Sequence, residues 1–261
     1  MAMTSFLRAL PLAAALAAAM PAPAATTCRA ASGTSLVPLV ELFTSEGCDS
    51  CPPADRWLAA QFPGLRDDVS VLAFHVDYWD RLGWKDRFAS AAYTARQYDA
   101  MRAGGATFVY TPQVLVQGRD AEFGRGTRAP ALLADARRRT PGATLTLDTA
   151  AADDGALAVA AAARIDAAQA HPRAVLWLAY TESGLTSDVG AGENRGTRLT
   201  HDHAVRRLEG PYPVADGMIR ATARFARPAE RGRDGAVVAV VQDARTYEVL
   251  QTLTQPRCGG Q

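Results

Sequence analysis

The chain has 261 residues, of which 48% are hydrophobic and 21% are charged. This composition allows an ordinary hydrophobic core and excludes a wholly disordered protein. Lysine and arginine number 28 and aspartate and glutamate 27, a formal charge of +1, so the chain lacks the basic excess by which proteins bind nucleic acid or an anionic membrane surface.

The first 24 residues have the features of a secretory signal peptide. Arg8 precedes an apolar stretch at 9–20, and Ala22 and Ala24 are the small residues that a signal peptidase requires. The stretch is shorter than the roughly 20 residues that span a bilayer. We therefore expect cleavage near Ala24 and a periplasmic or secreted protein with no stable membrane anchor; the alternatives are an uncleaved anchor and an Ala-rich tail.

Four cysteines remain in the mature chain, and disulfides persist outside the cytosol. Sequence alone allows three pairings. Cys28 and Cys258 lie near opposite ends of the mature chain, and the termini of a domain are often close in space. We therefore predict a structural disulfide between these two, which leaves Cys48 and Cys51 as a C-x-x-C motif.

The C-x-x-C motif lies between a predicted buried strand at 36–43 and a predicted helix at 54–62. The start of a helix favours a thiolate, because free N–H groups and the positive end of the helix dipole meet there. This placement predicts Cys48 as the attacking thiol and Cys51 as the more buried resolving thiol in disulfide exchange. The acidic residues that flank Cys48 oppose its ionisation.

Further elements follow before residue 141. They are a buried strand at 69–76, a helical insert with many aromatic residues at about 77–105, a proline directly before a strand at 113–116, a short strand at 121–123 and an amphipathic helix at 128–139.

This order of elements resembles the thioredoxin fold. The segments VELFTSEGCDSCPPAD, FHVDYWD, TPQVLVQG and GENRG with LTHDH closely resemble the bacterial exported family known as domain of unknown function 1223. The resemblance implies an α/β thioredoxin-like domain over 25–141. It also implies that Thr111 and Pro112 form a cis-proline motif that lies against the C-x-x-C motif and pairs with an extended substrate segment. Gly47 stands where classical members carry tryptophan, so the resemblance assigns no redox direction.

Residues 142–261 have a different sequence pattern, in which short apolar runs alternate with turn residues. This pattern predicts an all-β antiparallel sandwich domain after the α/β domain. The expected strands are 144–147, 156–165, 174–181, 199–208, 218–225, 236–242 and 247–253. A helix is the alternative for the Ala-rich segment at 150–170.

Histidines provide candidate metal ligands. His201 and His203 would project from the same face of a strand, with Glu193 nearby, and His75 could join Cys48 and Cys51 in a copper or zinc site. Zinc usually needs further cysteine or histidine ligands at short spacing, and a hydrogen-bond network is the more common role for such residues.

The leading functional hypothesis is thiol–disulfide exchange with protein or peptide partners, without a cofactor. One alternative is a non-enzymatic binding module in which the Cys48–Cys51 disulfide is structural. The other is a thioredoxin-like protein that binds copper or zinc.

Overall fold

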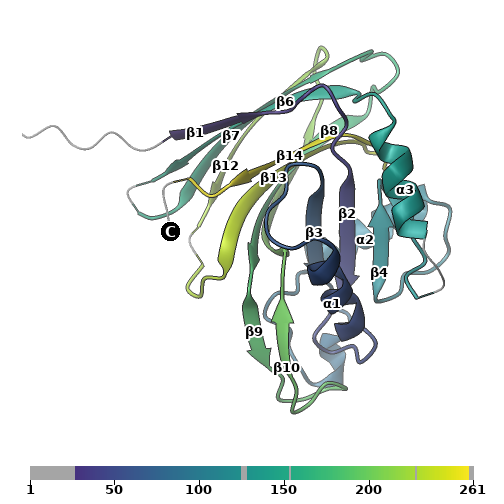
Figure 1. Cartoon of the computed structure of the whole chain (residues 1–261), viewed down its shortest axis with the longest axis vertical. Helices are drawn as coiled ribbons and strands as arrows, with labels where there is room; N and C mark the ends of the chain where they lie inside the picture. The colour runs from purple at the N-terminus through teal and green to yellow at the C-terminus, as the bar shows by residue number, and fades with distance from the viewer. Residues whose placement is uncertain (1–26, 125–127, 153, 227, 259–261) are drawn as a thin grey trace, which may run out of the picture.

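The computed structural model describes residues 27–124, 128–152, 154–226 and 228–258, and the chain forms mostly β-sheet (Figure 1). The predicted signal peptide and its cleavage point at Ala24 lie outside these residues. Among the described residues, no helix has both the length and the apolar character needed to cross a membrane.

The largest sheet has eight strands and combines segments from both halves of the chain. Its strands are, in spatial order, β14 (Val249–Pro256), β13 (Arg233–Asp243), β8 (Ala174–Ser183), β11 (Ala204–Pro213), β3 (Ser70–His75), β2 (Leu39–Thr44), β4 (Gln113–Val116) and β5 (Arg119–Asp120).

A second, antiparallel sheet packs against one end of the first. Its strands are β1 (Thr27–Ala31), β6 (Ala143–Ala151), β7 (Leu157–Ile165) and β12 (Met218–Phe225). Buried and exposed residues alternate along β6 and β7, because successive side chains of a strand point to opposite faces. The inward residues, such as Leu145 and Val159, pack with Leu176 and Val237 of the large sheet in one core cluster.

Two further short strands form a hairpin beside α1 (Figure 1). They are β9 (Leu185–Asp188) and β10 (Arg198–His201). Residues 189–197 connect them and are called the β9–β10 loop below.

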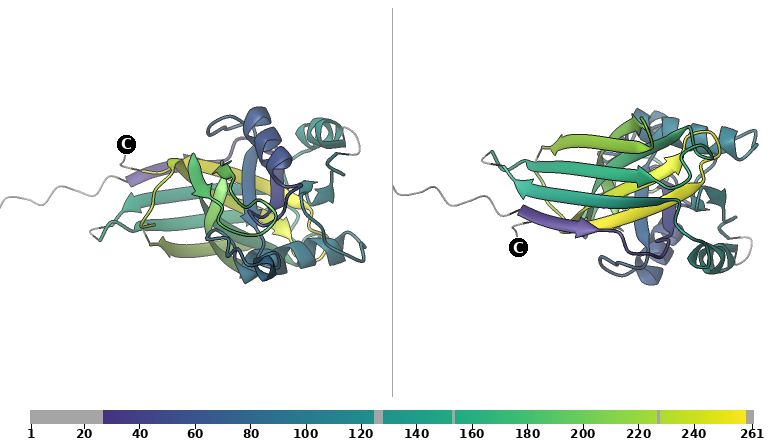
Figure 2. Two further views of the ribbon diagram at one scale, coloured as in Figure 1. Left: turned by 90° about the horizontal axis from the view of Figure 1, so that it is seen from below. Right: turned by 90° about the horizontal axis from the view of Figure 1, so that it is seen from above.

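Helices cover both faces of the large sheet around β2 and β3 (Figure 2). They are α1 (Pro52–Gln61), the 3-10 turn η1 (Asp80–Leu82), α2 (Ala91–Ala103) and α3 (Arg128–Arg137). Because side chains alternate along a strand, Val40 and Leu42 of β2 pack with α1 and α3, whereas Leu39 and Phe43 pack on the side of α2. Every residue of β2 is therefore buried.

The expected fold class, an α/β thioredoxin-like domain followed by an all-β antiparallel sandwich, is wrong. The helices are few, and the large sheet is mixed and continues from the first half of the chain into the second. The connection is the parallel pairing of β3 with β11, where Ala73 N donates to His203 O at 2.9 Å. The unpaired edge of a strand buried on both faces needs backbone partners, and β11 supplies them to β3.

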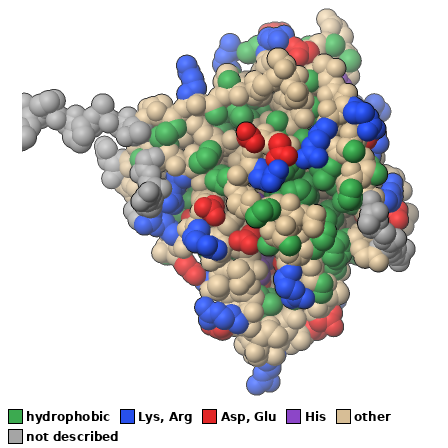
Figure 3. All heavy atoms as spheres, in the orientation of Figure 1, with side chains coloured by type: hydrophobic (Ala, Val, Ile, Leu, Met, Phe, Trp, Pro, Cys, Tyr) green, Lys and Arg blue, Asp and Glu red, His purple; other side chains and the backbone are tan. Residues whose placement is uncertain are grey.

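The first strand, β1, also connects the two halves of the chain. β1 pairs with β6, and a disulfide joins Cys28 of β1 to Cys258, 230 residues away in sequence. Charged side chains of both signs are interspersed on the face shown in Figure 3.

The strand predicted at 199–208 is two strands. β10 ends at His201 and β11 begins at Ala204, and His203 between them has a φ of 55°, which lies in the left-handed region that interrupts a strand. This interruption allows β10 to pair with β9 while β11 pairs with β3 and β8.

A buried arginine connects α2 to the large sheet. Arg96 Nε donates to Glu41 Oε1 of β2 at 2.7 Å, and its Nη2 donates to Gln242 Oε1 of β13 at 2.8 Å. Both side chains of the Arg96–Glu41 ion pair are 1% exposed. The guanidinium also lies over the rings of Trp177 and Tyr247. A single side chain thus contacts strands from both halves of the chain.

Candidate functional site

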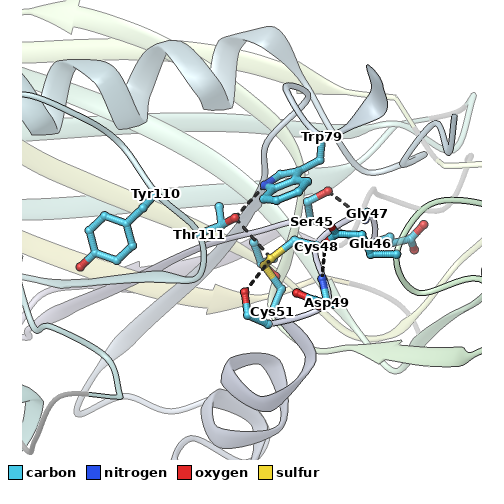
Figure 4. The surroundings of a disulfide bond; sticks show 12 residues. Ser45, Glu46, Gly47, Cys48, Asp49, Cys51, Trp79, Tyr110 and Thr111 are labelled. Atoms are coloured by element: carbon cyan, nitrogen blue, oxygen red, sulfur yellow. Dashed lines mark hydrogen bonds between the residues drawn. A yellow bond between two sulfur atoms is a disulfide. The ribbon is translucent and has the colours of Figure 1, made fainter. Parts of the chain in front are cut away.

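The Cys48–Cys51 disulfide lies between the end of β2 and the start of α1 (Figure 4). Both cysteines are 0% exposed. The predicted order of strand, C-x-x-C motif and helix is therefore present, and the sulfur atoms are covered by neighbouring residues.

The start of α1 offers fewer free N–H groups than expected. Its first two residues are Pro52 and Pro53, which have no backbone N–H. The next two N–H groups, those of Ala54 and Asp55, donate to Cys51 O at 2.8 and 3.1 Å. Hydrogen bonds to the Cys48 sulfur therefore come from side chains.

Thr111 is one source of such a hydrogen bond. Its hydroxyl donates to Cys48 Sγ at 3.4 Å and accepts a hydrogen bond from Trp79 Nε1 at 2.7 Å (Figure 4). The Ser50 hydroxyl lies 3.3 Å from the same sulfur. The Thr111–Pro112 peptide bond is cis. The structure thus brings the predicted pair Thr111 and Pro112 to the C-x-x-C motif.

The β9–β10 loop binds the backbone of the C-x-x-C segment from the other side. Asn194 Nδ2 donates to Glu46 O at 2.9 Å and to Cys48 O at 2.8 Å, and Asp49 N donates to Glu193 Oε2 at 3.1 Å. The sequence marks Glu193 as polar and as a candidate metal ligand, but no periodicity in the sequence indicates that this loop reaches the cysteines.

Behind the cysteines, Glu46 belongs to a buried group of ionisable side chains. His201 Nε2 lies 3.0 Å from Glu46 Oε1, and Trp84 Nε1 donates to Glu46 Oε2 at 2.7 Å. Burial raises the pKa of the Glu46 carboxyl, but the hydrogen bonds from His201 and Trp84 outweigh burial and hold it below its ordinary value. The Glu46 carboxylate is therefore stabilised in its charged form by His201 and Trp84.

A second buried pair lies next to the first. His75 Nδ1 is 2.6 Å from Asp86 Oδ2, and the rings of His75 and His201 are 4.8 Å apart. Desolvation lowers the pKa of His75, but the charge and hydrogen bond of Asp86 raise it by more, so that the pKa lies above its ordinary value. Desolvation likewise raises the pKa of Asp86, and His75 lowers it by more. The two residues stabilise each other as an ion pair.

Asp55 on α1 is a third carboxyl group near the cysteines. Its Oδ2 accepts a hydrogen bond from the Thr44 hydroxyl at 3.1 Å. Desolvation raises the pKa of Asp55 above its ordinary value, although the charges of His75 and His201 act in the opposite direction.

The predicted ligand set of His201, His203 and Glu193 does not assemble. His201 binds Glu46, whereas His203 Nε2 donates to Phe62 O at 2.7 Å, and Glu193 binds the backbone of Asp49. Over the part of the chain that the structure describes, no three histidine, cysteine, aspartate or glutamate side chains are grouped as metal ligands.

The His75–Asp86 pair predicts a pH-dependent stability. Its contribution should be complete between about pH 4 and pH 6.5, the ordinary pKa values of the two groups. It should be lost as pH rises through the elevated pKa of His75, or falls through the lowered pKa of Asp86. In urea unfolding across pH, Asp86→Asn should reduce the free energy of unfolding by about 2 kcal/mol inside this window and by less above it.

A His203→Gln variant is the control for this prediction. Desolvation lowers the pKa of His203, so its neutral form is favoured in the folded protein and its contribution fades as pH falls. As pH falls from 8 to 5, through the ordinary histidine pKa of about 6.5, the stability lost in Asp86→Asn should therefore increase. The stability lost in His203→Gln should decrease over the same range. Parallel profiles would contradict the assignment of His75 as the charged histidine.

Two solved structures resemble this chain. One is the crystal structure of a protein from Agrobacterium tumefaciens, with 26% sequence identity and a TM-score of 0.59, which covers 88% of this chain and 98% of that one. The other is HBP35 of Porphyromonas gingivalis, with 16% identity and a TM-score of 0.60, which covers 87% of this chain and 76% of that one and shows a similarity of fold alone. No curated protein matches the chain.

A family model establishes the relationship at the level of sequence. It describes a "protein of unknown function (DUF1223)" and matches residues 39–242, most of the chain. The match includes both cysteines of the C-x-x-C motif, Thr111 and the β9–β10 loop, and it confirms the resemblance to this family. The chain belongs to the DUF1223 family of proteins of unknown function.

Proposed function

We propose that the protein is exported and exchanges thiols and disulfides with protein or peptide partners. The observation that carries the proposal is the hydrogen bond from the Thr111 hydroxyl to Cys48 Sγ at the start of α1. A hydrogen bond to the charged form of an acid lowers its pKa, and the thiolate is the nucleophile in exchange. Cys48 is therefore the attacking thiol, and Cys51 is the resolving thiol.

The proposed reaction has two steps. The Cys48 thiolate attacks a partner disulfide, forms a mixed disulfide and releases one partner thiolate. The Cys51 thiolate then attacks Cys48 Sγ, forms the Cys48–Cys51 disulfide and releases the second partner thiolate. The two electrons lost by Cys48 and Cys51 reduce the partner, and the reverse sequence oxidises a partner dithiol.

Export and burial set the conditions for this reaction. The N-terminal signal features and the second disulfide, Cys28–Cys258, suit an oxidising compartment. Because Cys48 is 0% exposed, a partner can reach its sulfur only after nearby side chains move. Residues that contact this segment include Trp79, Thr111 and Asn194.

A trapping experiment tests the proposal. In Cys51→Ser the mixed disulfide on Cys48 cannot be resolved, so this variant should accumulate disulfide-linked partners in the native compartment. These complexes should separate on reducing gels. Cys48→Ser is the matched control, because it retains one thiol of the same motif but lacks the attacking one. Equal capture by the two variants, or capture by neither, would contradict exchange through Cys48.

A structural role for the disulfide is the second candidate, and the full burial of both sulfurs favours it. A redox titration separates the two functions. A structural disulfide should have a reduction potential below about −300 mV, whereas a disulfide that exchanges with partners should have a higher one. In the structural case, the protein would act as a binding module without exchange chemistry.

A further inference from the structure

We infer that Trp79 is a positioning residue for the Cys48 thiol, because its indole N–H orients the Thr111 hydroxyl so that the hydroxyl proton points at the sulfur. This inference rests on the proposed function only for its use in exchange; the hydrogen bonds themselves belong to the resting protein (Figure 4).

The direction of the two hydrogen bonds follows from their chemistry. An indole nitrogen can only donate, whereas a threonine hydroxyl has one proton and two lone pairs. Thr111 Oγ1 must therefore accept from Trp79 Nε1, at 2.7 Å. Its single proton remains available for Cys48 Sγ, at 3.4 Å. A thiolate formed on reduction receives this proton as a charge-assisted hydrogen bond.

The start of α1 makes this contribution more important. Pro52 and Pro53 occupy the positions whose N–H groups would otherwise face an anion at the helix start. The hydroxyl of Thr111 supplies a hydrogen-bond donor in place of these missing N–H groups. Trp79 is itself held against the C-x-x-C segment, since a Cβ atom on Gly47 would lie only 3.1 Å from Trp79 Cβ. A side chain at position 47 would press on the Cβ atom of Trp79.

Ser50 provides the comparison for Thr111. Its hydroxyl also lies near Cys48 Sγ, at 3.3 Å, and either atom can be the donor. Ser50 is exposed, so water can replace its hydroxyl, and no indole N–H determines the direction of its proton. The Thr111 hydroxyl is partly buried and already bound by Trp79. We therefore expect Thr111 to affect the thiolate more than Ser50 does.

Other ionisable groups lie on the elements around Cys48, and they are unchanged in the variants proposed below. The hydroxyl of Tyr78 lies beside Thr111, and burial raises the pKa of Tyr78 to about 12, so it stays protonated during a thiol titration. The other groups on the surrounding elements are Glu46 and Asp49 in the C-x-x-C segment, Asp55 on α1, Glu193 in the β9–β10 loop, and the buried His75, Asp86 and His201.

The test measures the pKa of Cys48 directly. In the full-length chain with Cys51→Ser, and with the Cys28–Cys258 disulfide intact, the ultraviolet absorbance of the thiolate is followed across pH. Adding Thr111→Val should raise the pKa of Cys48 by about 1 pH unit, whereas Thr111→Ser, which keeps the hydroxyl, should restore it. Trp79→Phe, which keeps an aromatic ring but removes the N–H, should raise it by about half as much.

A double variant decides whether Trp79 acts through Thr111. If it does, Trp79→Phe should have no additional effect when Thr111 is already valine. An equal additional effect in that background would show that the ring acts independently, and would overturn the inference. An unchanged pKa in Thr111→Val would overturn it as well. Ser50→Ala should change the pKa by less than Thr111→Val, and the reverse order would contradict the inference.

The measurement needs no partner protein, so its result is separate from that of the trapping experiment. If partners are captured but the pKa of Cys48 does not respond to Thr111 or Trp79, the exchange proposal stands and the positioning role is contradicted. If the pKa of Cys48 changes as expected but no partners are captured, the positioning role stands and the exchange proposal is contradicted. Circular dichroism of each variant confirms that the fold is retained, and Thr111→Ser provides a folded comparison if the valine variant does not fold.

Discussion

Removing the Cys28–Cys258 disulfide, as Cys28→Ala with Cys258→Ala, is expected to lower the free energy of unfolding by about 5 kcal/mol. The bond closes a loop across a sequence separation of 230 residues. In the chain-entropy account, the stabilisation increases with the logarithm of that length, because the bond removes conformations from the unfolded chain. Urea unfolding of the wild type and the variant under non-reducing conditions measures the difference.

The second disulfide of the chain supplies the control. Cys48→Ala with Cys51→Ala removes a bond that spans a sequence separation of 3, for which the same relation gives only about 2 kcal/mol. Each variant removes one disulfide bond and leaves the other in place. A larger loss for the C-x-x-C variant than for the terminal one would show that native contacts of the sulfurs, and not chain entropy, dominate.

Replacing Arg96 with alanine should destabilise the protein by about 3–5 kcal/mol, since it leaves the Glu41 carboxylate buried without its partner. Both side chains of this pair are 1% exposed, and Arg96 also binds Gln242 and lies over Trp177. The loss therefore includes an ion pair, a hydrogen bond and the packing of the guanidinium against an aromatic ring.

Arg102→Ala on the same helix is the matched control. Arg102 forms an ion pair with Asp99, but both side chains are about half exposed, and such pairs contribute at most about 1 kcal/mol. A combined Arg96→Met and Glu41→Leu variant should recover much of the stability that Arg96→Ala loses, because no charge is left buried. No recovery in the combined variant would indicate that packing, and not the unpaired charge, causes the loss.

The strand, the C-x-x-C motif and the helix of the candidate site could be predicted from local patterns, because the apolar run before Cys48 and the prolines after Cys51 are signals contained within a few residues. The approach of Thr111 and Pro112 to the cysteines is expected only from the family resemblance. The strand in the Ala-rich stretch at 156–165 is present as β7, and its alternating burial explains why a pattern of small residues still predicts a strand.

The fold class could not be predicted in the same way. It depends on the pairing of Ala73 with Ala204, two residues far apart in sequence whose neighbours would suit a strand at the edge of a sheet or in its middle. Local patterns determine which residues form strands, but not which strands become neighbours. The β9–β10 loop escaped prediction for a similar reason, because Asn194 in an irregular segment has no periodicity that indicates what it binds.

A shortened chain that ended at residue 141 would contain both motif cysteines, Trp79 and Thr111, but would lack Asn194 and His201. Two backbone carbonyls and a carboxylate beside the sulfurs would then each lose one hydrogen-bond partner, which is costly away from water. Ribosomes make the cysteines well before they make the segment that completes their surroundings. During synthesis, and in any truncated product, the backbone around the cysteines would therefore lack hydrogen bonds that hold it in the finished molecule.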